Sequence, residues 1–270
     1  MHPAAFGTCL LLAVAGLLSP VPPAQPAVRP VTTLAIAGTT SVQATVARSV
    51  VGLGDSVVSG RSCDCVPFVQ RYGRLTASRT GAIVTAHNLG VSGLTSERLL
   101  DQLGRGTEAA EAVRGADVVT ITIGANDMVP ARSAYWAGTC QGCFAAAAAT
   151  VRRHLIAVLQ RVRTLRAGRP TEILVTTYWN VFKEPTESSS AEFREMVERA
   201  TARANAAICA AASTGKVACI DLYRPFKGSG DRDPTPFLAP DRDHPNAAGH
   251  ALIAATLARH GWKELSAPGA

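Results

Sequence analysis

The chain has 270 residues, of which 47% are hydrophobic and 17% charged, and a formal net charge of +7. This length allows one full-sized hydrophobic core, and this composition excludes a largely disordered protein. Basic residues are scattered along the chain, with a group of arginines between positions 152 and 166. Scattered charge is typical of a solvated surface, so we expect no nucleic-acid partner.

The N-terminal segment has the pattern of an export signal. An apolar run from Cys9 to Leu18 is followed by a Pro- and Ala-rich stretch that reaches about residue 30, although no Lys or Arg precedes the run. The run is too short to span a bilayer and matches the length of a signal-peptide core. We expect a leader at 1–30, a linker at 31–47, a catalytic domain at 48–262 and a tail at 263–270. The sequence predicts a secreted protein, with an uncleaved N-terminal membrane anchor as the alternative.

Cysteine usage also favours export. Six cysteines follow the leader: Cys63, Cys65, Cys140, Cys143, Cys209 and Cys219. An even number suggests three disulfides, although six cysteines allow fifteen pairings. The first pair that we expect is Cys209–Cys219, which would join a helix end to the strand that follows. The close pairs Cys63–Cys65 and Cys140–Cys143 could bridge locally or pair across, and a four-thiolate zinc site is the alternative.

From about residue 48 onwards, short apolar runs alternate with longer helical stretches. The expected strands are Ser49–Leu53, Ile83–Asn88, Asp117–Ile123, Ile173–Tyr178 and Val217–Asp221. The expected helices are 66–78, 95–114, 143–168, 190–213 and 247–261. This alternation predicts an α/β fold with a parallel sheet of about five strands and helices on both faces. Right-handed crossovers then bring the carboxyl ends of the strands to one edge, where ligands bind in open sheets.

A candidate nucleophile follows the first expected strand, in the block Gly54-Asp55-Ser56. Gly54 permits a sharp turn, and the N–H of a serine that opens a helix can face a developing oxyanion. Taken alone, Asp55-Ser56 is more typical of a helix cap than of a catalytic serine. Position 58 is Val, so the block is not a Gly-x-Ser-x-Gly elbow, and position 57 is Val where a dinucleotide fingerprint needs Gly.

A candidate base lies in the block Asp241-Arg242-Asp243-His244-Pro245-Asn246. A serine hydroxyl needs such a base to become a nucleophile, and Asp241 can hold the imidazole tautomer while the other ring nitrogen faces Ser56. We expect Asp243 to be a solvated or capping residue that points away from His244, and Asn246 to cap the following helix. Metal ligation by His244 with the aspartates is an alternative. The other histidines of this region are expected to be structural (His250) or to lack matched partners (His87 and His154).

Oxyanion donors are expected after the second and third strands. Asn126 lies in Gly124-Ala125-Asn126-Asp127, and its amide can donate to an oxyanion, as can the N–H of Gly90 from the neighbouring loop. Asn and Gly are also common turn residues. Because these blocks meet at one sheet edge, we expect Ser56, Gly90 and Asn126 to form an oxyanion hole.

These blocks resemble the motifs of the GDSL/SGNH hydrolase family, over roughly residues 48–260. The matching segments are Gly54-Asp55-Ser56, Asn88-Leu89-Gly90 with Ser92-Gly93, Gly124-Ala125-Asn126-Asp127, and Asp241 with His244-Pro245. The resemblance implies a three-layer α/β/α fold of flavodoxin-like topology and ester hydrolysis without metal or cofactor. It also implies that Ser56 is the nucleophile, His244 the base and Asp241 the residue that orients it. The cysteine-rich, exported form is similar to secreted actinobacterial lipases and esterases.

The sequence therefore predicts a secreted serine esterase or lipase, acting as a monomer on a small-molecule or lipid ester with transient contact to a lipid interface. Loops 57–68, 128–142, 180–190 and 223–240 should set specificity. Their apolar residues favour an acyl chain: Phe68, Tyr135, Trp136, Trp179, Phe182, Phe226, Phe237 and Leu238. The alternatives are an acetyl-sugar or polysaccharide esterase and a cell-surface binding module without turnover.

Overall fold

The computed structural model describes residues 47–260, and within them it forms one five-stranded sheet. The strands are β1 (Ala47–Gly54), β2 (Ile83–Gly90), β3 (Val118–Thr122), β4 (Glu172–Thr176) and β5 (Ala218–Ile220). They are all parallel, in the order β2-β1-β3-β4-β5. The five predicted strands are confirmed, and the order is that of a flavodoxin-like sheet. The predicted leader and tail, and all but the last residue of the predicted linker, lie outside the described residues.

The strand register determines which residues meet at the carboxyl edge of the sheet. Gly54, the last residue of β1, is level with Gly90 on one side and with Thr122 on the other. The chain passes from β1 to β2 on one side of β1, and then crosses back to β3 on the other side. The order in which strands are added to the sheet therefore reverses between β1 and β3. Ligands of open α/β sheets bind at such a switch point, outside the carboxyl ends of the strands.

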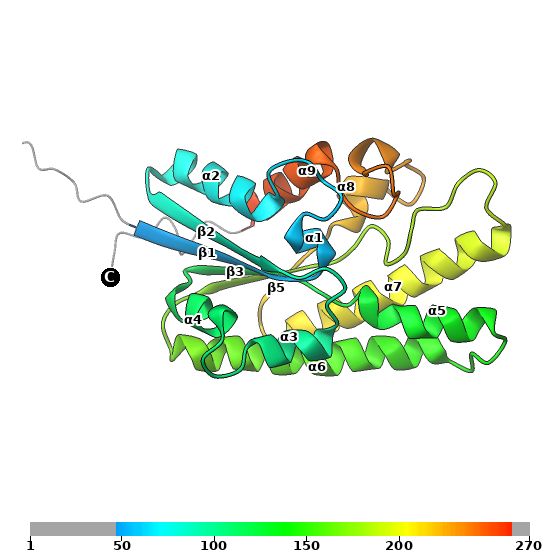
Figure 1. Cartoon of the computed structure of the whole chain (residues 1–270), viewed down its shortest axis with the longest axis horizontal. Helices are drawn as coiled ribbons and strands as arrows, with labels where there is room; N and C mark the ends of the chain where they lie inside the picture. Colours follow the sequence, from blue (N-terminus) through cyan, green and yellow to red (C-terminus); the bar gives the residue numbers. More distant parts are fainter. Residues whose placement is uncertain (1–46, 261–270) are drawn as a thin grey trace, which may run out of the picture. The chain divides into compact units, whose positions relative to one another are not determined.

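Helices cover both faces of the sheet, as predicted. Figure 1 shows α2 (Phe68–Thr80), α8 (Tyr223–Lys227) and α9 (Ala247–Ala258) on one side. On the other side lie α3 (Ser96–Gln102), α4 (Glu108–Gly115), α5 (Val129–Trp136), α6 (Cys143–Arg166) and α7 (Ala191–Thr214). The β-strands between these layers carry fully buried side chains such as Leu53 and Ile121. The three-layer α/β/α sandwich is therefore confirmed.

Some helices differ from the prediction. The expected helix at 95–114 is two helices, because the chain turns at Gly106 with a φ of +75° and Thr107 caps α4. A helix does begin at Ser56, but it is the single turn α1 (Ser56–Ser59), and the short helices α5 and α8 were not predicted. Among residues 47–260, no helix is long and apolar enough to cross a membrane.

Candidate active site

The turn after β1 places Ser56 at the carboxyl edge of the sheet. Gly54 has a φ of +138°, and a Cβ on it would lie 1.9 Å from the carbonyl oxygen of Thr122, so the turn requires glycine. Asp55 caps α1 by accepting the N–H of Val57 at 3.0 Å. Ser56 is the first residue of α1, and the N–H groups of a first helical turn have no partner within the helix.

Ser56, His244 and Asp241 form one hydrogen-bonded chain. The Ser56 Oγ lies 2.9 Å from Nε2 of His244, and Nδ1 of His244 lies 2.7 Å from Oδ2 of Asp241. Burial by itself would raise the pKa of Asp241, but hydrogen bonds from His244, Ser62 and Asp243 outweigh burial and hold that pKa well below its usual value. An ionised Asp241 favours the tautomer with the proton on Nδ1, which leaves Nε2 free to accept the serine proton.

The loop that carries His244 is fixed at both ends. The N–H of Ala239 donates to the carbonyl of His244 at 2.8 Å, closing the loop on itself. Asn246 caps α9, as predicted, by accepting the N–H groups of Ala248 and Gly249. These hydrogen bonds therefore fix the backbone of the turn that carries His244.

Asn126 and Gly93 face Ser56 from the next two loops. Nδ2 of Asn126 donates to the carbonyl of Leu94 at 2.9 Å, which ties the turn after β2 to the turn after β3. Gly93 has a φ of +79°, lines the same pocket as Ser56 and Asn126, and has open space where a Cβ would stand. Two N–H sources therefore adjoin the serine: the second proton of the Asn126 amide and the Gly93 backbone.

Gly90 is not brought to this pocket, contrary to our expectation. Its N–H donates to Oδ1 of Asn88 at 3.1 Å, and a Cβ on it would lie 2.3 Å from the backbone nitrogen of Ser59. Asn88 also donates to the carbonyl of Val58 at 2.7 Å. Gly90 therefore packs against α1, while Gly93, three residues later, lines the pocket.

A cavity of about 320 Å³ opens at Ser56 and His244. Its apolar lining includes Val57, Ala125, Val129, Val181 and Phe182, and its charged lining includes Arg61, Arg132, Lys183 and Asp243. Of the eight apolar loop residues that we expected around the site, only Trp179 and Phe182 line it. Phe226 instead stacks on Trp179 at 4.2 Å in the interior, and Phe68 is fully buried in α2. Phe68 and Phe226 are therefore packing residues and do not line the cavity.

Asp55 and Tyr178 form a buried pair beside the nucleophile. Asp55 is 1% exposed and accepts the hydroxyl of Tyr178 as well as the N–H of Val57. Burial raises the pKa of Asp55 to about 6, against the opposing effect of these hydrogen bonds. The pairing of Tyr178 with Asp55 was not predicted, because the end of β4 carries no motif that distinguishes Tyr178 from a core residue.

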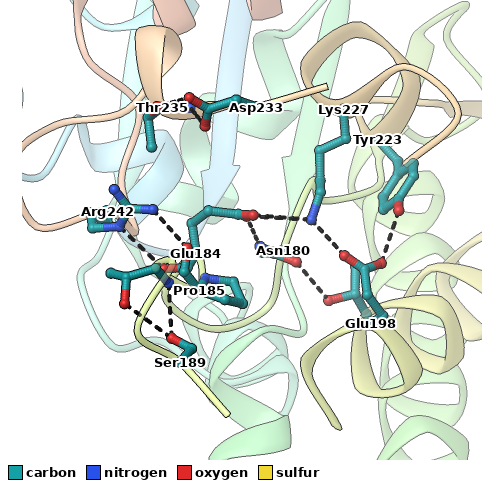
Figure 2. Close-up of polar contacts among 12 residues, drawn as sticks. Asn180, Glu184, Pro185, Ser189, Glu198, Tyr223, Lys227, Asp233, Thr235 and Arg242 are labelled. Carbon is teal, nitrogen blue, oxygen red and sulfur yellow. Dashed lines mark hydrogen bonds and ion pairs between the residues drawn. The ribbon is translucent and has the colours of Figure 1, made fainter. Parts of the chain in front are cut away.

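A second polar network holds the two loops that flank the pocket (Figure 2). Lys227, 4% exposed at its side chain, donates to Glu198 at 2.6 Å and to Glu184 at 3.3 Å. Glu184 in turn donates its N–H to the carbonyl of Arg242 at 2.7 Å, and Arg242 donates to the carbonyl of Pro185 at 2.7 Å. Arg242 lies between Asp241 and His244 in the sequence. The network therefore joins the loop that carries these two residues to the loop after β4.

Two expectations for single residues were wrong. Asp243 is not a solvated residue: it is half-buried, lines the cavity, and its pKa is raised by burial. His154 has a partner, since its Nδ1 lies 3.1 Å from Oγ of Ser96, which donates to Asp127 at 2.6 Å. His250 is buried and accepts the N–H of Phe68, in keeping with its expected structural place.

The six described cysteines form three disulfides: Cys63–Cys65, Cys140–Cys143 and Cys209–Cys219. The expected bridge between α7 and β5 is thus present, and the two close pairs bridge locally rather than across. Each pair of sulfurs is already bonded, which leaves no thiolates for the alternative zinc site. The described residues do place Cys63, Cys65 and His250 within 4.8 Å of one another, but two of these three share a disulfide.

Comparison with known proteins adds to this geometry. Residues 53–252 match the model of the GDSL-like lipase/acylhydrolase family. The spore germination lipase LipC of Bacillus licheniformis is 26% identical over 215 residues, which cover 79% of this chain and 96% of LipC.

Solved structures of similar fold include the lipase Lip_vut3 from a goat rumen metagenome. It has a TM-score of 0.68 and 23% identity, and the match covers 81% of this chain and 99% of that one. A mutant of an acetyl-xylooligosaccharide esterase from Geobacillus stearothermophilus has a TM-score of 0.59 and 18% identity, with 84% and 97% covered. At these identities the structures share the fold.

Proposed function

We propose that this chain, which belongs to the GDSL-like lipase/acylhydrolase family of ester hydrolases, cleaves carboxylic esters through an acyl-enzyme on Ser56. The observation that carries the proposal is the continuous chain from Ser56 Oγ through His244 to Asp241, with distances of 2.9 Å and 2.7 Å. A serine with a base in hydrogen-bond reach, and a third group that orients the base, is the arrangement of an activated hydroxyl nucleophile.

In this mechanism Ser56 Oγ attacks the carbonyl carbon of the ester while Nε2 of His244 takes the hydroxyl proton. The tetrahedral oxyanion accepts hydrogen bonds from the N–H groups of Ser56 and Gly93 and from the Asn126 amide. His244 then gives its proton to the leaving alcohol as the C–O bond breaks. Water, activated by the same imidazole, attacks the acyl-enzyme, and the acid leaves as the serine regains its proton. Asp241 stays ionised throughout and stabilises the imidazolium.

Labelling with a fluorophosphonate tests the nucleophile. We expect intact-mass spectrometry to find a single adduct, peptide mapping to place it on Ser56, and both Ser56→Ala and His244→Ala to abolish it. Ser92→Ala is a matched control, because Ser92 is an exposed serine close to α1 whose Oγ lies 3.2 Å from that of Ser59. Labelling that persists in Ser56→Ala, or ester turnover near the wild-type rate in that variant, would contradict the mechanism.

The acyl group that we propose is short. The cavity of about 320 Å³ lies at the lower end of the range for small-molecule pockets and must also hold part of the alcohol. A small cavity would also suit an acetyl group, so an acetyl-sugar esterase is the second candidate. Rates on p-nitrophenyl esters of increasing chain length, compared with an acetylated xylo-oligosaccharide, separate the two. A maximum at short chains with no release of acetate from the glycan supports the first.

We also propose that the protein is exported and acts as a monomer on small-molecule or lipid esters, without a nucleic-acid partner and with transient contact to a lipid interface. Three disulfides support export, because disulfides persist in oxidising compartments. The intact mass of the protein recovered outside the cell tests this proposal: loss of about the first 30 residues is expected, whereas a full-length, membrane-bound product would favour the N-terminal anchor. A folded protein that neither binds the fluorophosphonate nor turns over esters would instead be a binding module.

A further inference from the structure

Three cationic side chains converge on the cavity from three separate segments. Arg61 comes from the loop after α1, Arg132 from α5 and Lys183 from the loop after β4. Within residues 47–260, no hydrogen bond or salt bridge engages any of the three. A cation that lies beside a nucleophile and lacks a partner is available to a substrate.

Arg132 is the most constrained of the three. Its guanidinium lies 4.9 Å from the centre of the Phe182 ring, and the residue is half-buried. Stacking on an aromatic ring fixes the plane of the guanidinium while leaving its N–H donors unused. Burying a charge without a hydrogen-bonding partner is costly, which favours a bound anion at this place.

Lys183 follows Phe182 directly in the chain and lines the same cavity as Arg132. The carboxylate that faces both cations is Asp243, and both favour its charged form. Asp55 also lines the cavity, but its carboxyl is taken by Tyr178 and Val57. Three cations therefore face one available carboxylate.

Two neighbouring cations, Lys227 on α8 and Arg242 in the loop of the triad, differ from these three because their side chains are held by hydrogen bonds. Lys227 is held by Glu184 and Glu198, and Arg242 by the carbonyls of Glu184 and Pro185 (Figure 2). These two cations thus have hydrogen-bonding partners, whereas within the described residues Arg132 and Lys183, which line the cavity, have only the nearby charge of Asp243 as a polar partner.

We propose that this hydrolase is selective for esters that carry a carboxylate or phosphate group, which Arg132 and Lys183 bind beside the reacting carbonyl while Arg61 attracts it from the opposite loop. The inference rests on the proposed function, since it names the substrate class of the same site. A bidentate guanidinium and a mobile ammonium suit either anion, and the charge can lie on the acyl chain or on the alcohol.

Matched ester pairs test the proposal and locate the charge. The first pair is p-nitrophenyl hexanoate and the mono-p-nitrophenyl ester of adipic acid, which differ by a carboxylate on the acyl chain. The second is hexanoyl glycerol and hexanoyl glycerol phosphate, which differ on the alcohol. In at least one pair we expect kcat/KM to be about tenfold higher for the anionic ester, and the ratio to fall as salt is added.

Variants assign the selectivity to the two cations. In the double variant Arg132→Gln/Lys183→Gln the ratio of anionic to neutral kcat/KM is expected to fall about tenfold. The control Arg74→Gln/Arg152→Gln removes the same charge from exposed sites on α2 and α6 that do not line the cavity, and should keep the wild-type ratio. Because Lys183 is exposed, Lys183→Gln alone should fold and shift the ratio in the same direction.

Binding separates this inference from the hydrolase proposal. In Ser56→Ala, calorimetry measures the affinity for each ester without turnover, and the anionic member should bind more tightly. Equal affinities within both pairs, or a ratio that is the same in wild type and in the double variant, would overturn the charge selectivity even if Ser56 is labelled. Absent labelling with selective binding would instead overturn the hydrolase proposal alone.

Discussion

Replacing the buried Asp55 by asparagine is expected to stabilise the protein at neutral pH. Asp55 is 1% exposed, and burial raises its pKa from 3.8 to about 6. The folded state therefore binds more protons than the unfolded state between these two values. The stability that this carboxyl contributes is full below about pH 3.8 and is lost as the pH rises through about 6. A shift of about two pKa units corresponds to about 3 kcal/mol at neutral pH.

In Asp55→Asn this loss is absent. The amide oxygen still accepts the N–H of Val57, and the amide nitrogen donates to the hydroxyl of Tyr178, which costs about 1 kcal/mol for the rearranged hydrogen bond. The net gain in the free energy of unfolding is expected to be about 2 kcal/mol at about pH 7.5 and close to zero at about pH 4.5. Urea denaturation at the two pH values measures both quantities.

Tyr178→Phe provides the complementary variant. It keeps the carboxyl of Asp55 but removes a hydrogen-bond donor that lowers its pKa, so that pKa should rise further. The loss of stability should then extend to higher pH than in the wild type. If Asp55→Asn differs from the wild type by the same free energy at both pH values, Asp55 does not titrate in this window and the reasoning is wrong.

Three further changes test other parts of the structure. Lys227→Met removes the cation, 4% exposed, that neutralises Glu184 and Glu198, and should cost about 3 kcal/mol in urea denaturation. Arg199→Met, on an ion pair whose partners are 54% and 68% exposed, should cost less than about 0.5 kcal/mol. Replacing Cys209 and Cys219 by serine opens a short loop and should cost about 3 kcal/mol, and a stability equal to that of the wild type would argue against the bridge. Asn126→Ala should lower kcat by about 10²- to 10³-fold with little change in the thermal midpoint, and an unchanged kcat would remove Asn126 from the oxyanion hole.

The sequence predicted those features that depend on strong local patterns. The five strands were visible because buried parallel strands such as Val118–Thr122 are continuously apolar. Asp241 and His244 were paired correctly in space because they are three residues apart in one loop, and the sheet topology brought Ser56 to them across 188 positions. The short helix α5 has too few residues to show a helical period.

The expected place of Gly90 in the pocket was wrong for a different reason. Gly90 and Gly93 follow the same strand and are three residues apart, and composition does not distinguish them. The two glycines differ in their contacts. The N–H of Gly90 donates to the side chain of Asn88. The amide of Asn126 donates to the carbonyl of Leu94, which holds the adjacent Gly93 at the pocket. The only signal in the sequence was that Gly93 comes after the strand has ended, where the chain is free to turn, whereas Gly90 still pairs with Gly54.

The contacts around Arg242 imply that the cavity-lining Lys183 and the proposed catalytic His244 are held in place by the same hydrogen bonds. Arg242 has a φ of +59°, a conformation that costs free energy in a residue with a side chain, and it lies between Asp241 and Asp243. Its hydrogen bonds to the backbone of Glu184 and Pro185 hold this turn, and Lys227 holds Glu184. The residue before Glu184 is Lys183, which lines the cavity. A change that loosens Glu184 should therefore disturb both the position of the substrate-facing lysine and the turn at Arg242, because Glu184 and Pro185 hold Arg242 through their backbone carbonyls.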